Sequence, residues 1–413
     1  MMQKPIVVIG GGIVGICTAL TCAQAGQAVT LIERDAPGQG ASFGNAGVIS
    51  PFSIIPQSAP GLWKNIPRWL LDPLGPVRVR PGYFPRFIPW GMRFLAKGRA
   101  SEVARISAAM HHLNHDNIEL FQQHLAGTGH EGLIQSSAYV YAFRDAKKAS
   151  LEGQDMDLRR AVGAKISLLN AGELHELEPD LSPEFKAALV FHGQARAVSP
   201  GRIGAVLAEK LRAMGGVILR ETVTRIVPGT SARWAVVTDQ TTHESDSIVI
   251  SAGAWSAQIL APLGIKLPLE AERGYHVMFA DPGVTLHNSI MDMDMKFVAS
   301  SMEDGFRAAG TAEFAGLDQP PTQKRIEGLK TMARRMCPTM DDTRVSTWMG
   351  TRPSFPDSLP VIGPAPGKPG LTLAFGHAHW GFMMGPKTGR IAADLAMGRR
   401  PNVDLTPYRA DRF

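Results

Sequence analysis

Residues 5–47 read PIVVIGGGIVGICTALTCAQAGQAVTLIERDAPGQGASFGNAG, and this stretch decides the fold. The β-branched run at residues 5–9 predicts a short strand that is buried on both faces. A helical pattern follows from residue 13 to about residue 25, and a second apolar run at residues 28–32 ends in Glu33. This order predicts a βαβ unit with two parallel strands.

The turn between the first strand and the helix carries Gly10, Gly12 and Gly15 in the spacing G-x-G-x-x-G. Gly10 permits the tight turn, Gly12 lets a pyrophosphate approach the backbone, and Gly15 lets the helix pack close to the strand. The N-terminus of the helix favours phosphate charge, and Glu33 can accept hydrogen bonds from ribose hydroxyls. Because these features lie in register, they predict an adenine dinucleotide site rather than a purely structural turn.

The chain has 413 residues, which favours two domains or one domain with a large insertion. Its three cysteines (Cys17, Cys22 and Cys337) form no C-x-x-C pair, so we expect buried thiols in a reducing cytoplasm. The N-terminal apolar run is interrupted by the glycines, and no other run is long enough to span a bilayer. We therefore expect neither a signal peptide nor a transmembrane helix.

Residues 51–95, called the 51–95 segment below, differ in composition from the rest of the chain. They contain nine prolines, three tryptophans and one acidic residue, Asp72, against six basic residues (Lys64, Arg68, Arg78, Arg80, Arg86 and Arg93). The net charge of +6 is thus largely local, and we expect no nucleic-acid surface. Tryptophan among cations is typical of membrane interfaces. The alternative is an excursion that packs on its own protein or on a second subunit. We favour it because the prolines argue against a regular amphipathic helix.

Apolar periodicity predicts further elements downstream. Helices are expected at residues 99–126, 146–161, 201–214 and 322–336. Strands are expected at residues 217–219, 222–227, 234–238 and 247–250 in one sheet, and at 275–279, 296–299 and 306–310 in an antiparallel set. His111 and His115 lack a Glu or Cys partner at metal-ligand spacing, so no metal site is expected.

The chain ends with a second strand–turn–helix unit. Residues 371–375 form the expected strand, a turn rich in glycine and histidine follows, and a helix is expected from Pro386 to about Gly398. The N-terminus of such a helix favours negative charge, such as the charge that a reduced flavin carries near N1. The alternative is a plain connection between strand and helix.

Together these motifs resemble the glycine oxidase and D-amino-acid oxidase superfamily of FAD enzymes, and within it the bacterial D-amino-acid dehydrogenases. Besides the N-terminal unit, the resemblance rests on residues 42–47 (SFGNAG), 251–255 (SAGAW), 273–275 (RGY), 307–313 (RAAGTAE), 351–363 (TRPSFPDSLPVIG), 376–377 (GH), Gly381 and 389–390 (GR). It spans nearly the whole chain.

The resemblance implies an α/β fold with a discontinuous Rossmann-like FAD-binding domain and an antiparallel-sheet substrate-binding domain. The FAD-binding domain would comprise residues 1–50, 195–265 and 345–413, and the substrate-binding domain residues 96–194 and 266–344, with 51–95 as the excursion. No cysteine lies near the C-terminal turn, so FAD is expected to be bound non-covalently.

The resemblance also implies a set of site residues. FAD would contact Gly10, Gly12, Gly15, Glu33, Ser42, Asn45, Ala46, Gly47, Val223, Gly253, Trp255, Gly381, Phe382 and Met383. Arg352 would hold the substrate carboxylate through two parallel hydrogen bonds, Tyr275 would add a phenol donor, and His379 would lie near the flavin. Without the resemblance, these three residues are more simply a loop arginine, a half-buried sheet tyrosine and a core histidine.

The implied activity is oxidative deamination of a D-amino acid, including cyclic ones such as D-proline or D-hydroxyproline, by hydride transfer to flavin N5. Electrons would pass to a quinone or another acceptor. The protein would be cytoplasmic, with peripheral contact to the inner face of the cell membrane through the 51–95 segment. One alternative is a glycine- or sarcosine-type oxidase that releases hydrogen peroxide. A second is a dinucleotide-binding protein with a sensing or scaffolding role.

Overall fold

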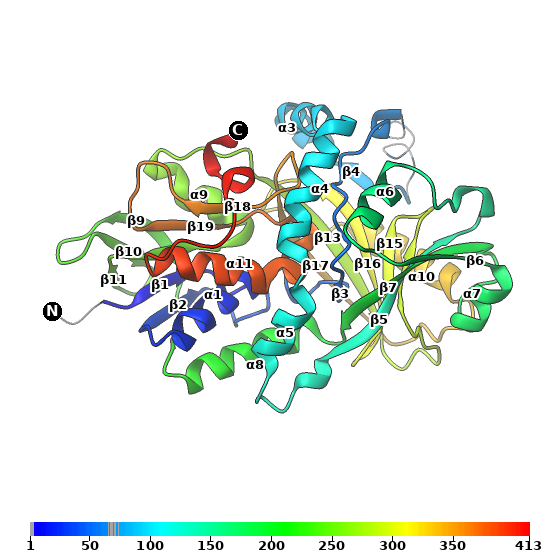
Figure 1. Cartoon of the computed structure of the whole chain (residues 1–413), viewed down its shortest axis with the longest axis horizontal. Coiled ribbons are helices and arrows are strands. Elements are labelled where there is room, and N and C mark those ends of the chain that lie inside the picture. The colour runs from blue at the N-terminus through cyan, green and yellow to red at the C-terminus, as the bar shows by residue number, and fades with distance from the viewer. Residues whose placement is uncertain (1–3, 65, 67–68, 70–71, 73) are drawn as a thin grey trace.

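The computed structural model describes residues 4–64, 66, 69, 72 and 74–413, and Figure 1 shows their arrangement. Arg68, one of the cations of the 51–95 segment, lies outside the described residues. The strands form sheets of six, three and ten strands. In Figure 1 the six-stranded sheet lies on the left and the ten-stranded sheet on the right.

The six-stranded sheet has the order β18-β19-β12-β1-β2-β8. Its strands are β1 (Ile6–Ile9), β2 (Val29–Glu33), β8 (Val217–Arg220), β12 (Ile248–Ile250), β18 (Val361–Pro364) and β19 (Leu371–Phe375). Every neighbouring pair is parallel except β18 with β19. The sheet therefore joins the first unit of the chain to the last, as expected for a discontinuous Rossmann-like fold.

The two faces of β1 pack against different layers. Ile6 and Val8 point to the helices α1 (Ile13–Gln24), α8 (Pro200–Ala213) and α11 (Gly381–Ala396). Val7 and Ile9 point to a three-stranded sheet of β9 (Val223–Pro228), β10 (Trp234–Thr238) and β11 (Thr242–Ser245). The prediction that β9 and β10 continue the sheet of β8 and β12 is wrong, because they pair with each other and with β11 and cover one face of that sheet.

Helices α1 and α11 lie side by side, in blue and red in Figure 1. Glycine makes this contact possible, since a Cβ on Gly389 would lie 2.7 Å from Cβ of Cys17. The prediction that the last helix starts at Pro386 is wrong. It starts at Gly381, and Pro386 lies in its second turn, where the missing N–H costs the helix one hydrogen bond. Gly398 ends the helix in a left-handed conformation, as predicted.

The ten-stranded sheet follows the path β17-β13-β16-β15-β14-β5-β7-β3, with β4 paired to β16 and β6 to β7. Its strands are β3 (Val48–Ile49), β4 (Val77–Val79), β5 (Ile134–Phe143), β6 (Ile166–Asn170), β7 (Ala187–Ala197), β13 (Glu270–Phe279), β14 (Ser289–Asp292), β15 (Phe297–Met302), β16 (Gly305–Phe314) and β17 (Val345–Ser354). Because β17 pairs with β13, it belongs with the large sheet and not with the FAD-binding segments that the sequence placed from residue 345 onward.

One face of this sheet is packed and the other faces a cavity. Helix α10 (Gln323–Met336) covers the packed face, where it meets Tyr275, Val277 and Phe279. Side chains alternate along a strand, so Glu272, Gly274 and His276 of β13 point to the opposite face. That face carries the site described below.

Two expected helices are interrupted. Residues 99–126 form α4 (Ala100–Asn114) and α5 (Asn117–Leu125) rather than one helix. The break lies at Asp116, whose carboxylate pairs with Lys387 of α11 at 2.6 Å. The second is the helix expected at residues 146–161. It forms a short 3-10 turn at Ala146–Lys148, and α6 (Gln154–Ala161) begins only after Gly153, which has a φ of 112°.

The 51–95 segment contains an amphipathic helix, α3 (Phe84–Ala96), so the prediction that its prolines argue against one is wrong. Pro85 stands in the first turn, where no N–H is needed, and Pro89 costs one hydrogen bond near the start. Trp90 is buried against Phe314, which fixes the helix to the large sheet. Among the residues described, none of the helices combines the length and the apolar character needed to cross a bilayer.

Candidate active site

A cavity of about 1200 Å³ lies between the six-stranded sheet and the open face of the large sheet. It is lined by the β1–α1 turn, residues 40–42, 44–46 and 48, the turn after β12, the start of α11 and strands of the large sheet. All of the predicted cofactor residues line it except Gly15 and Gly47, and so do Arg352, Tyr275 and His379. The structure thus brings together residues from both ends of the chain.

The glycines of the first turn hold α1 against the sheet. Gly10 has a φ of 102°, and a Cβ there would lie 2.5 Å from the Ser251 carbonyl oxygen. A Cβ on Gly15 would lie 1.9 Å from the carbonyl oxygen of Gly10, so Gly15 serves close packing and not the cavity surface. Gly12 faces the cavity, with the Ser42 hydroxyl 3.6 Å from where its Cβ would be.

Glu33 marks one end of the cavity. Its carboxylate accepts hydrogen bonds from the backbone N–H groups of Gly11 and Asp35, which fix it at the end of β2. Val223 of β9 and Trp255 line the same end, and the Arg34 guanidinium lies 3.8 Å from the centre of a Trp255 ring. This end offers a ribose acceptor beside a flat aromatic wall.

Residues 42–47 form the side of the cavity next to α1. The Ser42 hydroxyl accepts from the N–H of Ile13 at 3.0 Å, and the Asn45 side chain accepts from Gly47 N–H at 2.8 Å. The Asn45 carbonyl in turn accepts from Arg307 at 2.8 Å. Gly47, with a φ of 79°, lies against Ala197 of β7 and so anchors the loop rather than lining the cavity.

The start of α11 forms the opposite side. Gly381, Phe382 and Met383 line the cavity, and the first turn contains no acidic side chain. His377 shapes the preceding turn by bonding the Thr388 hydroxyl at 2.9 Å, and burial lowers its pKa to about 3, so it is neutral. Gly253, with a φ of 54°, has open space where a Cβ would lie.

These features fit a dinucleotide. Two helix N-termini without acidic first turns, those of α1 and α11, open onto one cavity. Both favour negative charge, one near the glycine turn and one near the large sheet. A ligand with a diphosphate at one point and a ring that becomes anionic on reduction matches both sites.

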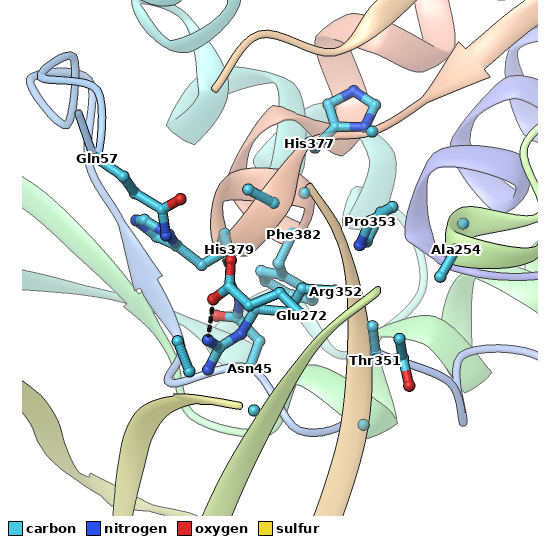
Figure 2. A pocket seen from close by; sticks show the side chains of 18 of the residues that line it. Asn45, Gln57, Ala254, Glu272, Thr351, Arg352, Pro353, His377, His379 and Phe382 are labelled. Carbon is cyan, nitrogen blue, oxygen red and sulfur yellow. Dashed lines mark hydrogen bonds and ion pairs between the residues drawn. The ribbon is translucent and has the colours of Figure 1, made fainter. Parts of the chain in front are cut away.

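Arg352 of β17 lies at the large-sheet end of the cavity beside Glu272 of β13 (Figure 2). Its Nη1 donates to Glu272 Oε1 at 2.7 Å and to the Thr311 carbonyl at 3.0 Å. The guanidinium covers Gly274, where a Cβ would lie 2.2 Å from Nη2. Among the described residues, Nε and Nη2 have no hydrogen-bond partner. One edge of the fork is therefore available to a ligand carboxylate.

Glu272 is ionised despite being only 1% exposed. Burial raises its pKa, but the positive charge of Arg352, together with the hydrogen bond from the Ser354 hydroxyl, outweighs burial and holds the pKa below its usual range. The Ser354 hydroxyl donates to Glu272 Oε2 at 2.8 Å. Glu272 thus fixes the position of Arg352 and offsets its charge.

His379 lies beside this pair, as Figure 2 shows. Its Nδ1 is 3.1 Å from the amide nitrogen of Gln57, which comes from the 51–95 segment. Burial lowers the pKa of His379 to about 4, which the Glu272 carboxylate only partly offsets. The imidazole is therefore neutral at pH 7 and serves as a hydrogen-bonding wall rather than a cation.

Tyr275 does not join this group, and its predicted role beside Arg352 is corrected. Its hydroxyl donates to Glu313 and accepts from the N–H of Thr322 at 3.1 Å, on the packed face of the sheet. Since Arg352 pairs with Glu272 and points to the cavity face, the phenol lies on the opposite side of β13. Tyr275 therefore cannot donate to a ligand held by Arg352.

A family model described as FAD dependent oxidoreductase matches residues 5–395. The chain belongs to this family. FAD is therefore the cofactor of this oxidoreductase, and the dinucleotide-shaped cavity is the place that fits it.

Individual relatives cover the whole chain. It is 38% identical over 421 residues to a D-amino-acid oxidase of Bradyrhizobium diazoefficiens, which covers 99% of each chain. It is 30% identical over 430 residues to a D-amino acid dehydrogenase of Rhizorhabdus wittichii, covering 99% of this chain and 100% of the relative. The crystal structure of glycine oxidase from Geobacillus kaustophilus matches with a TM-score of 0.76 over 100% of both chains. At 20% identity it shows a shared fold.

Sequence reasoning missed Glu272, Gly274 and Gln57. Glu272 carried no clear signal in the sequence, because the burial of its strand along the whole length is seen only in the fold. Its pairing with Arg352 carried none either, since the two residues are 80 positions apart and the register of β13 with β17 is visible only in the fold.

Gly274→Ala tests the position of the guanidinium in this oxidoreductase. The new methyl group would overlap Arg352, so the guanidinium must move away from the sheet and lose its fixed geometry. We expect KM for the substrate to rise at least about 10-fold, because one or more charge-assisted hydrogen bonds to the substrate would be lost. The FAD content should be unchanged. Steady-state kinetics and flavin absorbance measure both. An unchanged KM would show that the guanidinium does not bind substrate.

Proposed function

We propose that the protein oxidises a D-amino acid with FAD and that Arg352 holds the α-carboxylate. The observation that carries this proposal is the free Nε–Nη2 edge of Arg352 at the end of the cavity where α11 begins. The names of the relatives, D-amino-acid oxidase and D-amino acid dehydrogenase, support the substrate class.

FAD would supply the acceptor for the hydride, with its two electrons, that leaves the substrate α-carbon. The protein contributes binding and orientation. Arg352 fixes the carboxylate in its fork, Glu272 holds Arg352, and neutral His379 borders the substrate without adding charge. Positioning of this kind accounts for a large part of a rate enhancement without a strong side-chain base.

We also propose a role for each part of the cofactor site. Gly12 and the start of α1 hold the diphosphate, Glu33 the ribose, and the Val223 backbone the adenine. Ser42, Asn45, Ala46, Gly253, Trp255, Gly381, Phe382 and Met383 line the path of the cofactor. Gly15 and Gly47 act indirectly, by fixing α1 and the 42–47 loop. The last segment of the FAD-binding part would then begin after β17, near residue 355, rather than at residue 345.

Anaerobic reduction of the bound flavin tests the activity. We expect D-amino acids to bleach the flavin absorbance near 450 nm and their L-enantiomers to leave it oxidised. The panel includes D-alanine, D-proline, D-hydroxyproline, glycine and sarcosine. Bleaching by L- but not D-amino acids, or by none of them, would overturn the proposal. The latter would favour a sensing or scaffolding protein.

The second candidate is an oxidase that passes electrons to oxygen. It is favoured by the relative at 38% identity, which is named an oxidase. Stoichiometric hydrogen peroxide during turnover in air would support the oxidase. Slow reoxidation in air with rapid reoxidation by a quinone analogue would support a dehydrogenase.

We infer further that α3 docks on a membrane surface. Phe84, Ile88, Met92 and Leu95 form an exposed apolar stripe, with Met92 67% exposed, and Trp63 of the same segment is 63% exposed. Arg86 and Arg93 of α3 are also exposed, outside the stripe, and a helix with exposed apolar and cationic side chains suits anionic lipid headgroups. The stripe also lines the cavity, so a lipophilic acceptor such as a quinone would have a route inward.

Met92→Glu tests this surface. Placing a charge in the stripe should lower binding to vesicles containing anionic phospholipid by roughly 10-fold, since one buried apolar side chain contributes about 1.5–3 kcal/mol. Leu168→Glu, on β6 at an apolar residue that is 46% exposed, is the matched control and should sediment like the parent. If both variants sediment equally with the vesicles, the apolar stripe of α3 does not bind the membrane.

A further inference from the structure

The cavity extends beyond Arg352 along the open face of the large sheet. From β17 it passes β13 and β16 to β15, β14 and β5, where Val298, Met291 and Tyr139 line it. Lys296, at the end of the β14–β15 turn, lines the same part. Nothing in the cofactor site or in the binding of an α-carboxylate uses this region.

Lys296 is held in an unfavourable backbone conformation. Its φ is 58°, one of five positive values among non-glycine residues in the described chain. The β14–β15 turn holds it there, because Lys296 N–H donates to the Asp292 carbonyl at 2.8 Å and the Asp292 side chain caps the turn. Strain of this kind persists where surrounding structure fixes it and is concentrated at ligand sites.

The ammonium group of Lys296 has no hydrogen bond or ion pair with any residue that the structure describes. Burial lowers its pKa, and Asp294 and Asp292 only partly oppose that effect. Asp294 is itself paired with Lys148 at 2.9 Å. A largely enclosed cation that forms no ion pair of its own is costly, and an anionic ligand would offset the cost.

Thr311 of β16 is a second strained and unpartnered group in the same part of the cavity. It has a φ of 61°, although a β-branched residue rarely adopts that conformation. Its hydroxyl is buried without a hydrogen-bond partner, and the residue is 7% exposed and lines the cavity. Lys296 and Thr311 are thus two polar groups that the fold holds towards a ligand without satisfying them.

The two groups lie one strand apart. Phe297, next to Lys296, pairs with Gly310, next to Thr311. Neighbouring strands are about 4.8 Å apart, so the backbones of Lys296 and Thr311 are about one strand spacing from each other. The Thr311 carbonyl accepts from Arg352 at 3.0 Å. Arg352 therefore reaches β16 across β13 from one side, Lys296 lies on the other side of β16, and both line the same cavity.

The other charged side chains that line this part of the cavity are paired with each other. Arg159 of α6 pairs with Asp155 at 3.3 Å, and both line the cavity. Their charges offset each other, and Arg159 also approaches the Tyr141 hydroxyl at 3.3 Å. The three carboxylates nearest in charge to Lys296, those of Asp155, Asp292 and Asp294, are thus each paired with another cation, and Lys296 adds a positive charge beyond these pairs.

We propose that Lys296 and Thr311 form a second anion subsite, which binds the side-chain carboxylate of an acidic D-amino acid while Arg352 holds its α-carboxylate. This inference rests on the proposed function and narrows it to D-aspartate- or D-glutamate-like substrates. Lys296 donates to the distal carboxylate, and the Thr311 hydroxyl donates a second hydrogen bond.

Lys296→Met tests the subsite by removing the charge at similar length. With D-glutamate, kcat/KM should fall roughly 10- to 100-fold, the range for a hydrogen bond to a charged group. With D-glutamine, which has the same shape but no charge, it should change less than about 3-fold. Lys147→Met, at an exposed surface lysine, is the matched control and should behave like the parent. Lys296→Arg should retain most of the activity with D-glutamate.

A binding measurement separates this inference from the proposed function. The holoenzyme is titrated with glutarate and with its neutral-ended analogue butyrate, and the flavin absorbance change reports binding. Tighter binding of glutarate that Lys296→Met abolishes supports the subsite, even if no D-amino acid is oxidised. If D-alanine bleaches the flavin but D-glutamate and D-glutamine react equally, or if Lys296→Met weakens both ligands alike, the subsite is wrong and the proposed function stands.

Discussion

Arg352→Met should lower kcat/KM for any amino-acid substrate by roughly 100- to 1,000-fold while FAD stays bound. The guanidinium is the positive group at the large-sheet end with a free bidentate edge, and loss of a buried charge-assisted pair costs about 2–5 kcal/mol. Methionine keeps the apolar stem over Gly274, so the change is confined to the charge. Stopped-flow reduction of the flavin measures substrate affinity and the reduction step separately.

The same substitution has a second effect, which must be removed before the loss is interpreted. Glu272 is 1% exposed and would be left without its counter-ion, and an unpaired buried charge costs about 3 kcal/mol of folding free energy. The double variant Arg352→Met/Glu272→Gln removes both charges and keeps the contact with Ser354. We expect it to regain most of the thermal stability and none of the activity. If the double variant also regained turnover, Arg352 would be a structural partner of Glu272 and not the carboxylate anchor.

The nucleotide end of the site could be predicted from the sequence because its parts are contiguous. The glycine turn, the helix and Glu33 lie within one βαβ unit, whose geometry follows from local spacing. The start of α11 is harder to predict from the sequence. Proline is common in the first turn of a helix, but Pro386 lies in the second turn of α11. The α1–α11 contact that sets it depends on Gly385 and Gly389 packing on a helix more than 360 residues earlier.

The substrate end could not be predicted, because it depends on strand register. Tyr275 and Glu272 are three residues apart on β13, so alternation places them on opposite faces. The sequence offers no sign of which face holds the cavity. Glu272 meets Arg352, and Lys296 approaches Thr311, only through pairings between distant strands. Resemblance identified Arg352, but the surrounding charges required the fold.

Gly15→Ala should give a protein that has lost most of its affinity for FAD. The added Cβ would lie 1.9 Å from the Gly10 carbonyl oxygen and 2.7 Å from the Ser251 hydroxyl, and a backbone atom cannot move aside as a side chain can. Helix α1 must then shift from β1, and its first-turn N–H groups leave the position that favours the diphosphate. Overpacking alone costs about 1–3 kcal/mol, so the melting temperature should fall even without FAD.

Two further glycine variants separate packing from cofactor contact. Gly12→Ala should weaken FAD binding without lowering the stability of the apoprotein, because its Cβ would point into the cavity with only the Ser42 hydroxyl 3.6 Å away. Gly132→Ala, where a Cβ would have open space, should change neither quantity. FAD affinity is measured by titrating the apoprotein and following quenching of flavin fluorescence. If Gly15→Ala bound FAD as Gly132→Ala does, the close contact between α1 and β1 would not position the cofactor, and residues 10–15 would act only through Gly10 and Gly12.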